Sequence, residues 1–229
     1  TFVLDWREDV SDIRRDLSIA NYQYTDTKKS LWVAGASDTD ESAAEKDADP
    51  TKAQKNKQNY TPAKWDIQKY VTTNRFINND KSNVNWYFLR YADVLLLYAE
   101  ALNEWKHGPD AEAYNAINAV RRRGYGNPSN TSACDLPQGL DETSFREAVR
   151  KERSYELSFE GHRRQDLIRW GIYYKTVQAT AKELGYWWEG TGSPNYSVAT
   201  YTEEGKHELF PIPQRDMDLC IQFNQNPKW

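Results

Sequence analysis

Residues 87–103 read YFLRYADVLLLYAEALN, and apolar side chains recur along this stretch at the spacing of an α-helix. They form two rows, the first of Phe88, Tyr91, Leu95, Ala99 and Leu102 and the second of Tyr87, Val94, Tyr98 and Ala101. Apolar side chains three and four positions apart share one face of a helix. A helix with two apolar faces packs between neighbours, so the stretch predicts a helix sandwiched inside an all-α fold.

A second helix is expected after a short break. Residues 107–109 read HGP and interrupt the first pattern, Asp110 is a suitable N-cap, and residues 111–124 read AEAYNAINAVRRRG and end in glycine. The small residues of this helix are Ala111, Ala113, Ala116 and Ala119. Small side chains let helices approach closely, so residues 86–126 predict one tetratricopeptide-like helical hairpin. Such hairpins need neighbours, which are expected upstream of Thr1 or among the other helices of the chain.

Further helical patterns follow the hairpin. Ser144 and Glu147 form a capping box, which predicts a helix that starts at Phe145 and runs through Leu157. Gly161 is expected to kink or end this helix. Additional helices are predicted over residues 164–170, 173–184 and 214–219. The expected fold is therefore all-α, with strands at most short.

The stretch KERSYELSFEGHRRQDLIRWG, residues 151–171, gathers acids and bases at regular spacing. Glu152, Glu156 and Glu160 would share one face of a continuous helix. Its arginines, the expected partners of these acids, are Arg153, Arg163, Arg164 and Arg169. Arginines this close keep carboxylates ionised, which does not suit the acid of a glycosidase. A structural ion-pair network is therefore favoured over a glycosidase that uses Glu152 or Glu156.

Other function classes are disfavoured by what the sequence lacks. The net charge of −4 gives no footprint for nucleic acid, and no apolar run is long enough to span a bilayer. The histidines and cysteines have no metal-site spacing, so no metal site is expected from them, and no cofactor is expected. Whether calcium binds among the acids of residues 38–49, whose spacing fits no compact calcium loop, stays open. No serine nucleophile elbow, phosphate-binding glycine loop or Cys/His pair occurs. Whether Cys134 and Cys220 pair stays open.

Aromatic residues are the unusual feature of the composition. The chain has 9 Trp, 15 Tyr and 7 Phe, which together make 14% of its residues. Residues 36–59 contain no large apolar side chain and predict a long exposed polar loop. Rings flank this loop, as is common for binding loops, and sugar rings present C–H faces that stack on aromatic side chains. Carbohydrate is therefore one candidate ligand.

Three blocks of sequence resemble the SusD/RagB outer-membrane nutrient-binding lipoproteins of Bacteroidetes. They are YFLRYADVLLLYAEALNE with INAVRRRGYG at residues 87–126, KERSYELSFEGHRRQDLIRWG at 151–171, and LFPIPQRDMDLCIQFNQNPKW at 209–229. The resemblance implies an α-α superhelix with tetratricopeptide-like hairpins and long aromatic-rich loops. It also implies that residues 1–229 are the C-terminal part of a longer protein.

The resemblance also implies a function. Family members hold glycans or oligosaccharides at the cell surface, without catalysis, for a SusC-like TonB-dependent transporter in the outer membrane. The expected membrane attachment is a lipid on an N-terminal cysteine outside this chain. The expected stacking rings, each of which could equally belong to the core, are Trp32, Tyr60, Trp65, Trp187, Trp188 and Tyr196. The alternative function is a tetratricopeptide-like scaffold that binds a peptide or protein.

Overall fold

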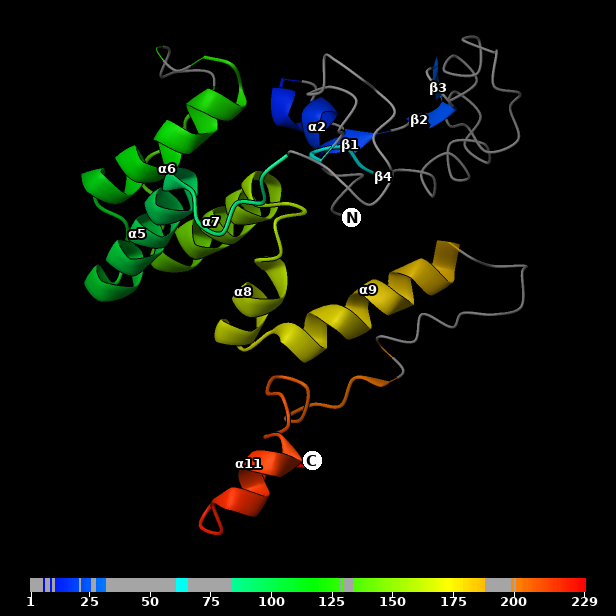
Figure 1. Cartoon of the computed structure of the whole chain (residues 1–229). Helices are drawn as coiled ribbons and strands as arrows, with labels where there is room; N and C mark the ends of the chain where they lie inside the picture. The colour runs from blue at the N-terminus through cyan, green and yellow to red at the C-terminus, as the bar shows by residue number, and fades with distance from the viewer. Residues whose placement is uncertain are drawn as a thin grey trace. The chain divides into compact units, whose positions relative to one another are not determined.

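The structure is a computed structural model. It describes residues 6, 9, 11–20, 22–25, 28–31, 61–65, 84–127, 129, 134–187, 199 and 201–229. The chain forms two compact units, Thr1–Gly161 and His162–Trp229, and helices make up most of the described residues (Figure 1). The predicted all-α class is confirmed. The expected loop at residues 36–59 lies outside the described residues.

The first unit has three long helices, and its other elements are short. Its elements are α2 (Ile13–Ser18), β1 (Ile19–Ala20), β2 (Tyr22–Thr25), β3 (Lys28–Leu31), β4 (Thr61–Pro62), α5 (Tyr91–Lys106), α6 (Ala111–Gly124) and α7 (Glu142–Glu156). The strands form two separate antiparallel pairs, β1 with β4 and β2 with β3. In the first pair Ile19 lies opposite Pro62, which brings β4 and the residues after it next to the end of α2.

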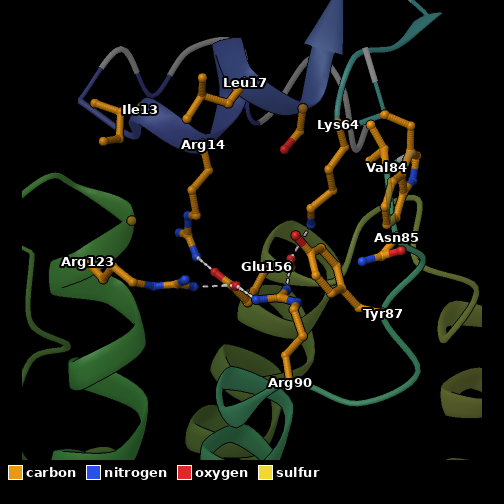
Figure 2. Close-up of a pocket in the computed structure, with 13 residues that line it drawn as sticks. Ile13, Arg14, Leu17, Lys64, Val84, Asn85, Tyr87, Arg90, Arg123 and Glu156 are labelled. Carbon is orange, nitrogen blue, oxygen red and sulfur yellow. Dashed lines mark hydrogen bonds and ion pairs between the residues drawn. The ribbon is translucent and has the colours of Figure 1, made fainter. Parts of the chain in front are cut away.

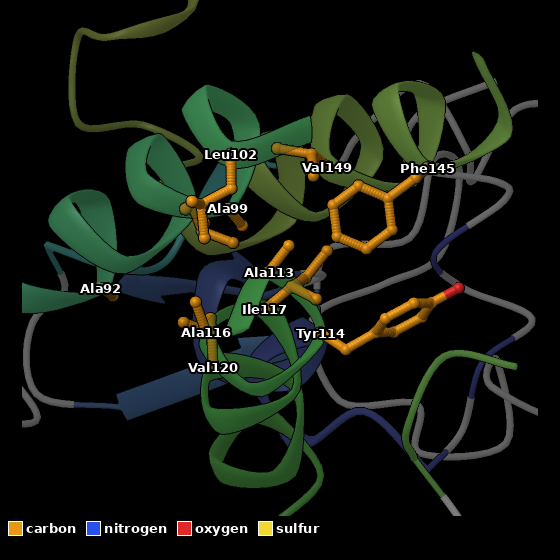
Figure 3. Close-up of a cluster of buried hydrophobic side chains, with 11 residues drawn as sticks. Ala92, Ala99, Leu102, Ala113, Tyr114, Ala116, Ile117, Val120, Phe145 and Val149 are labelled. Atoms are coloured by element: carbon orange, nitrogen blue, oxygen red, sulfur yellow. The ribbon is translucent and has the colours of Figure 1, made fainter. Parts of the chain in front are cut away.

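The core of the first unit lies where α5, α6 and α7 meet (Figure 3). It consists of Ala92, Leu96, Ala99 and Leu102 from α5, Ala113, Tyr114, Ala116, Ile117 and Val120 from α6, and Phe145 and Val149 from α7. The rings of Tyr114 and Phe145 meet edge to face with 5.1 Å between their centroids. Burial of each large apolar side chain contributes about 1.5–3 kcal/mol, so this cluster holds the three helices together.

The helical hairpin predicted over residues 86–126 is present as α5 and α6. The first helix begins at Tyr91, four residues later than the apolar pattern suggested, because Arg90 before it has an extended backbone. It ends at Lys106, and its C-cap His107 adopts a left-handed conformation with φ of 55°. Asp110 caps α6 as predicted, and its carboxylate accepts the Ala113 N–H at 2.9 Å. Ala113 and Ala116 face the core, but Ala111 and Ala119 are exposed.

The outer face of α5 differs from the prediction of a helix covered on two sides. Among the described residues this face has no covering element, and Tyr91 and Trp105 are each 75% exposed. The inner face is the one that packs on α6 and α7. We call the outer row of side chains, which comprises Tyr91, Val94, Tyr98, Ala101 and Trp105, the outer stripe.

The start of α7 also differs from the prediction. The helix begins at Glu142, and its N-cap is Asp141, whose carboxylate accepts the Ser144 N–H at 2.7 Å. Ser144 therefore lies inside the first turn and is not the cap. The helix ends at Glu156, so Glu152, Glu156 and Glu160 do not lie on one continuous helix. Turns over residues 157–161 follow, with Phe159 at φ of 61° and Gly161 at φ of 86°.

The second unit contains α8 (Arg163–Arg169), α9 (Tyr173–Trp187) and α11 (Gln214–Leu219). The predicted helices over residues 164–170 and 214–219 are confirmed to within a residue, and α9 extends three residues beyond its predicted end. Arg164 donates to the backbone oxygen of His207 at 2.6 Å, and this bond ties α8 to the segment before α11. Cys220, in this unit, is an exposed free thiol, and Cys134, in the first unit, is a buried one.

Candidate functional site

A cavity of about 610 Å³ opens in the first unit, next to α2 (Figure 2). Its other borders are residues 64–65 after β4, residues 84–90 before α5, and the C-terminal ends of α6 and α7. The larger apolar and aromatic lining residues are Ile13, Leu17, Trp65, Val84 and Tyr87. The charged and amide lining residues are Arg14, Lys64, Asn85, Arg90, Arg123 and Glu156. The cavity therefore combines apolar walls with a few polar groups, as ligand sites commonly do.

Local hydrogen bonds position α2 at the edge of the cavity. Asp12 is its N-cap and accepts the Arg14 N–H at 3.0 Å, while the indole N–H of Trp6 donates to the same carboxylate at 2.9 Å. The ring of Trp6 stacks on Tyr155 of α7 with 4.7 Å between centroids. Trp6 and Asp12 are both buried. This short helix is therefore held by tertiary contacts, since six residues do not form a stable helix alone.

Glu156 lies on one side of the cavity and is only 3% exposed. Three arginines from separate parts of the chain donate to its carboxylate: Arg14 at 3.0 Å, Arg90 at 2.7 Å, and Arg123 (Figure 2). Arg14 belongs to α2, Arg90 precedes α5, and Arg123 lies in the last turn of α6. One buried carboxylate thus connects three elements to the end of α7.

Glu152, one turn earlier on α7, shares one of these arginines. Its carboxylate accepts from Arg14 at 2.6 Å and from Arg121 at 2.9 Å, and its side chain is 1% exposed. The Arg14 side chain also lies against the backbone of α6, where a Cβ on Gly124 would be 2.3 Å from the Arg14 Nε. Glycine at this position therefore leaves room for the arginine that joins α2 to α7.

Glu160 completes the group on the turn after α7. Arg90 donates to it twice, each bond being 2.7 Å, and Lys64 forms an ion pair with it. Lys64 also donates to the backbone oxygen of Glu156 at 2.7 Å, and a cation at the C-terminus of a helix is favourable. We call the following set the ion-pair network: Asp12, Arg14, Lys64, Arg90, Arg121, Arg123, Glu152, Glu156 and Glu160.

The network determines the protonation of its members. Burial alone would raise the pKa of Glu156, but Arg123, Arg14 and Arg90 outweigh it and hold that pKa below its ordinary value of 4.5. Burial lowers the pKa of Lys64, and its pairing with Glu160 offsets only part of that effect. Glu156 is therefore ionised at neutral pH, and its oxygens are occupied by arginines. A carboxylate in this state does not serve as a proton donor.

Aromatic rings form one wall of the cavity, where Tyr87 lies across Glu156 from Arg123 of α6 (Figure 2). The ring of Trp65 stacks on Trp86 with 4.5 Å between centroids, and its indole N–H donates to the Phe159 backbone oxygen at 2.8 Å. Tyr87 lies beside it, tilted by 39° at 5.6 Å, and both Trp65 and Tyr87 line the cavity. Trp65 is therefore fixed by its neighbours, while Tyr87 is about half exposed.

Three polar groups of the lining remain available for a ligand. The Tyr87 hydroxyl and the Asn85 amide have no hydrogen-bond partner within the described part of the chain. Arg123 uses only its Nη2 atom, on Glu156, and its side chain is 55% exposed. Tyr87 and Asn85 lie on one side of Glu156 and Arg123 on the other (Figure 2), so the three groups can orient a polar ligand that packs on the rings.

Comparison with known proteins identifies the family of this chain. The sequence model of the SusD family matches residues 5–229. The chain belongs to the SusD family. SusD-like protein P25 of Formosa agariphila is 38% identical over 145 residues, which cover 63% of this chain and 23% of that protein. SusD-like protein P2 of the same organism is 36% identical over 92 residues, or 40% of this chain and 18% of that protein. The matched part thus spans less than a quarter of either relative.

Only one of the six rings predicted to stack on glycan can be placed in this SusD-family chain. Trp65 lines the cavity, as described above. Trp187 is the last residue of α9, in the second unit, and its side chain is not among those described. The predicted residues that lie outside the described part are Trp32, Tyr60, Trp188 and Tyr196. The stacking roles stay predictions.

The structure also shows cavity residues that the sequence did not single out. Tyr87 was assigned to an apolar helical row, whereas it precedes α5 and lines the cavity. Arg14, Arg90 and Arg123 were not expected as partners of the glutamates; of the predicted arginines, Arg153 pairs with Asp93 at 2.7 Å instead. The prediction of a structural ion-pair network is confirmed, but with different arginines. Their spacing in the sequence gives no signal, since 142 residues separate Arg14 from Glu156.

Neither a metal-binding cluster nor a membrane-spanning helix is present among the described residues. No group of three or more His, Cys, Asp or Glu side chains is placed to hold a metal ion in the part of the chain that the structure covers. Within the same residues, no helix has the length and apolar character needed to cross a membrane.

Proposed function

We propose that the chain is the C-terminal part of a SusD-family protein that binds glycans at the cell surface without catalysing a reaction on them. Family membership supports a glycan-binding role in nutrient uptake in general. The observation that carries the proposal for this chain is the cavity beside α2, where Trp65 and Tyr87 form an aromatic wall and Asn85 adds an amide.

The cavity suits a sugar in size and chemistry. Its volume of about 610 Å³ is within the range of about 300–1,000 Å³ found for small-molecule sites. The C–H face of a sugar ring packs on aromatic surface, and its hydroxyls need donors and acceptors beside that surface. The Tyr87 hydroxyl and the Asn85 amide offer both. Trp65 is held by Trp86 and Phe159, so binding would not require it to be ordered first.

The absence of catalysis is part of the proposal. A glycosidase needs one carboxyl group that is protonated and a second that is free to act as base or nucleophile. The carboxylate of the cavity, Glu156, accepts from three arginines, and its pKa is lowered. Glu152 and Glu160 are likewise buried and paired. These contacts support a structural role for the acids.

The proposed cellular setting follows from family membership. We propose that the full-length protein is attached to the outer membrane by a lipid at its N-terminus, outside this chain, and faces outward. We further propose that it delivers its glycan to a SusC-like TonB-dependent transporter. Trp32, Tyr60, Trp187, Trp188 and Tyr196 remain proposed as additional stacking rings, together with Trp65.

Calorimetric titration of a panel of neutral and acidic polysaccharides tests the proposal. Saturable binding to at least one member is expected, with Tyr87→Ala weakening it at least about tenfold, because truncation of an aromatic anchor removes most of its contact area. Trp65→Ala is expected to do the same, with circular dichroism to confirm that the helices persist. The matched control is Trp105→Ala, since this exposed ring does not line the cavity.

The outcomes separate clearly. Unchanged binding in Tyr87→Ala and Trp65→Ala would place the glycan away from this cavity. Absence of binding across the panel by folded wild-type protein would contradict the glycan-binding function itself. Release of reducing sugar that disappears in Glu156→Gln would show that the protein is an enzyme.

The outer stripe of α5 favours a second candidate function, a scaffold that binds a helical peptide or protein. Its apolar residues follow the alternating spacing of three and four that helix–helix seams use, and exposed apolar patches mark interaction surfaces. The double variant Tyr91→Ser/Trp105→Ser discriminates between the two functions. The glycan proposal predicts unchanged sugar binding by this variant. The scaffold function predicts that the wild type binds no sugar. It also predicts that a protein bound by the wild type is not bound by the double variant.

A further inference from the structure

The charges around the cavity do not balance. Its charged lining residues are the bases Arg14, Lys64, Arg90 and Arg123 and the acid Glu156. The whole ion-pair network contains five bases and four acids, which leaves one positive charge among the described residues of the network. The buried bases are paired with buried carboxylates. The one unbalanced positive charge therefore lies on the part of the network that solvent reaches.

Arg123 is the base at which this surplus is accessible. Its side chain is 55% exposed, against 11% for Arg14 and 17% for Arg90. It donates to Glu156 only through Nη2, and Nε and Nη1 have no partner among the residues that the structure describes. Glu156 does not depend on Arg123 alone, because Arg14 and Arg90 also donate to it. Arg123 can therefore bind an anion while the buried pairs stay intact.

The position of Arg123 relative to the rings sets the kind of anion. Figure 2 shows Arg123 entering from α6 on one side of Glu156, with Tyr87 and Asn85 on the other side of the carboxylate. All three belong to the lining of one cavity of about 610 Å³. A ligand that packs on Tyr87 and also reaches Arg123 needs an apolar face for the ring and an anionic group for the guanidinium. A sugar with an anionic substituent has this form.

We propose that the cavity selects an anionic sugar, whose carboxylate or sulfate ester accepts hydrogen bonds from Arg123 while its ring packs against Tyr87 and Trp65. The inference rests on the proposed glycan-binding function and names the class of glycan for the same site. A guanidinium binds oxyanions through short charge-assisted hydrogen bonds, which are stronger than bonds between neutral groups. A neutral sugar of the same shape gains less from Arg123.

The test compares matched sugars that differ only in charge. Oligogalacturonates are titrated against their methyl esters, and sulfated dextran oligosaccharides against the desulfated forms, with the 229-residue chain in each case. At least one acidic form is expected to bind about tenfold or more tightly than its neutral counterpart, since a hydrogen bond to a charged group is worth that much. Added salt is expected to weaken the acidic form and to leave the neutral form nearly unchanged. The galacturonate pair tests binding of a carboxylate, and the dextran pair tests binding of a sulfate ester.

Variants of two adjacent arginines locate the effect. Arg123→Gln is expected to remove the preference for the acidic form and to weaken the neutral form much less than the acidic one, while Arg123→Lys retains part of the preference. The control is Arg122→Gln, because Arg122 pairs with Asp135 and does not line the cavity. Urea unfolding of each variant shows whether the ion-pair network survives the substitution.

Each result has a distinct meaning. Equal affinity for acidic and neutral sugars, or a preference that survives Arg123→Gln in a folded protein, overturns the anionic selectivity and leaves glycan binding intact. Failure of every acidic and neutral sugar to bind overturns the proposed function and this inference together. A preference that Arg122→Gln abolishes as fully as Arg123→Gln does is also against the proposal, since it would come from general surface charge.

Discussion

Replacement of Glu156 by glutamine probes the ion-pair network at the residue that most of its arginines share. The change keeps the shape of the side chain and removes the charge that Arg14, Arg90 and Arg123 surround. Removal of one partner from a buried ion pair costs about 3–5 kcal/mol. Arg14 retains Asp12 and Glu152, Arg90 retains Glu160, and Arg123 is open to solvent, so we expect the lower end, about 3 kcal/mol.

Urea unfolding followed by circular dichroism at neutral pH measures this loss. The matched control is Glu147→Gln on the same helix, because Glu147 is 62% exposed and its partner is Arg150, one turn away. A surface pair of this kind is worth less than about 0.5 kcal/mol. If Glu156→Gln unfolds at the same urea concentration as Glu147→Gln and the wild type, the argument that the glutamate holds the fold together is wrong.

Two further predictions concern the same region. The folded-state pKa of Glu156 is lowered from 4.5, so its contribution to the free energy of unfolding is complete above that pH and is lost as pH falls through the folded-state pKa. The difference between wild type and Glu156→Gln in urea unfolding should therefore narrow in acid; a constant difference would contradict it. Gly124→Ala should destabilise the chain by about 1–3 kcal/mol, because the new Cβ would lie 2.3 Å from the Arg14 Nε. In an Arg14→Ala background the same change should cost little, and an equal cost there would rule out this clash as its cause.

Local signals in the sequence were sufficient for most helices. The bounds of α6 were predicted because Asp110 caps it and a glycine ends it, so that chemistry at both ends agreed with the apolar pattern. The start of α7 was placed too late because Ser144 and Glu147 form a capping pattern inside a helix that Asp141 already caps. Two competing caps three residues apart cannot be ranked without the tertiary structure.

The start of α5 was misplaced for a different reason. Phe88 and Leu89 continue the apolar pattern, but Arg90 is held in an extended conformation where its side chain bonds to Glu156 and Glu160. A contact with residues 66 and 70 positions away overrides the local preference for helix. No local pattern in the sequence contains that information.

Of the candidate site, only an aromatic residue was predicted from the sequence. Trp65 was singled out because it belongs to a group of rings next to a polar segment, and it does line the cavity. The partners of the glutamates could not be assigned, because they lie far away in the sequence: Arg14 is 138 positions from Glu152, and Arg121 is 31 positions from it. The sequence assigned no role to Arg123, because its bond to Glu156 joins α6 to α7 across 33 positions of the chain.

The most direct test of the account is a crystal structure of the chain with a glycan identified by titration. We expect a sugar in the cavity beside α2, with its ring against Tyr87 or Trp65 and with Glu156 still held by Arg14 and Arg90. A glycan bound elsewhere on the chain, or one that draws Arg14 and Arg90 away from Glu156, would contradict the division between aromatic residues that bind and ion pairs that hold the fold.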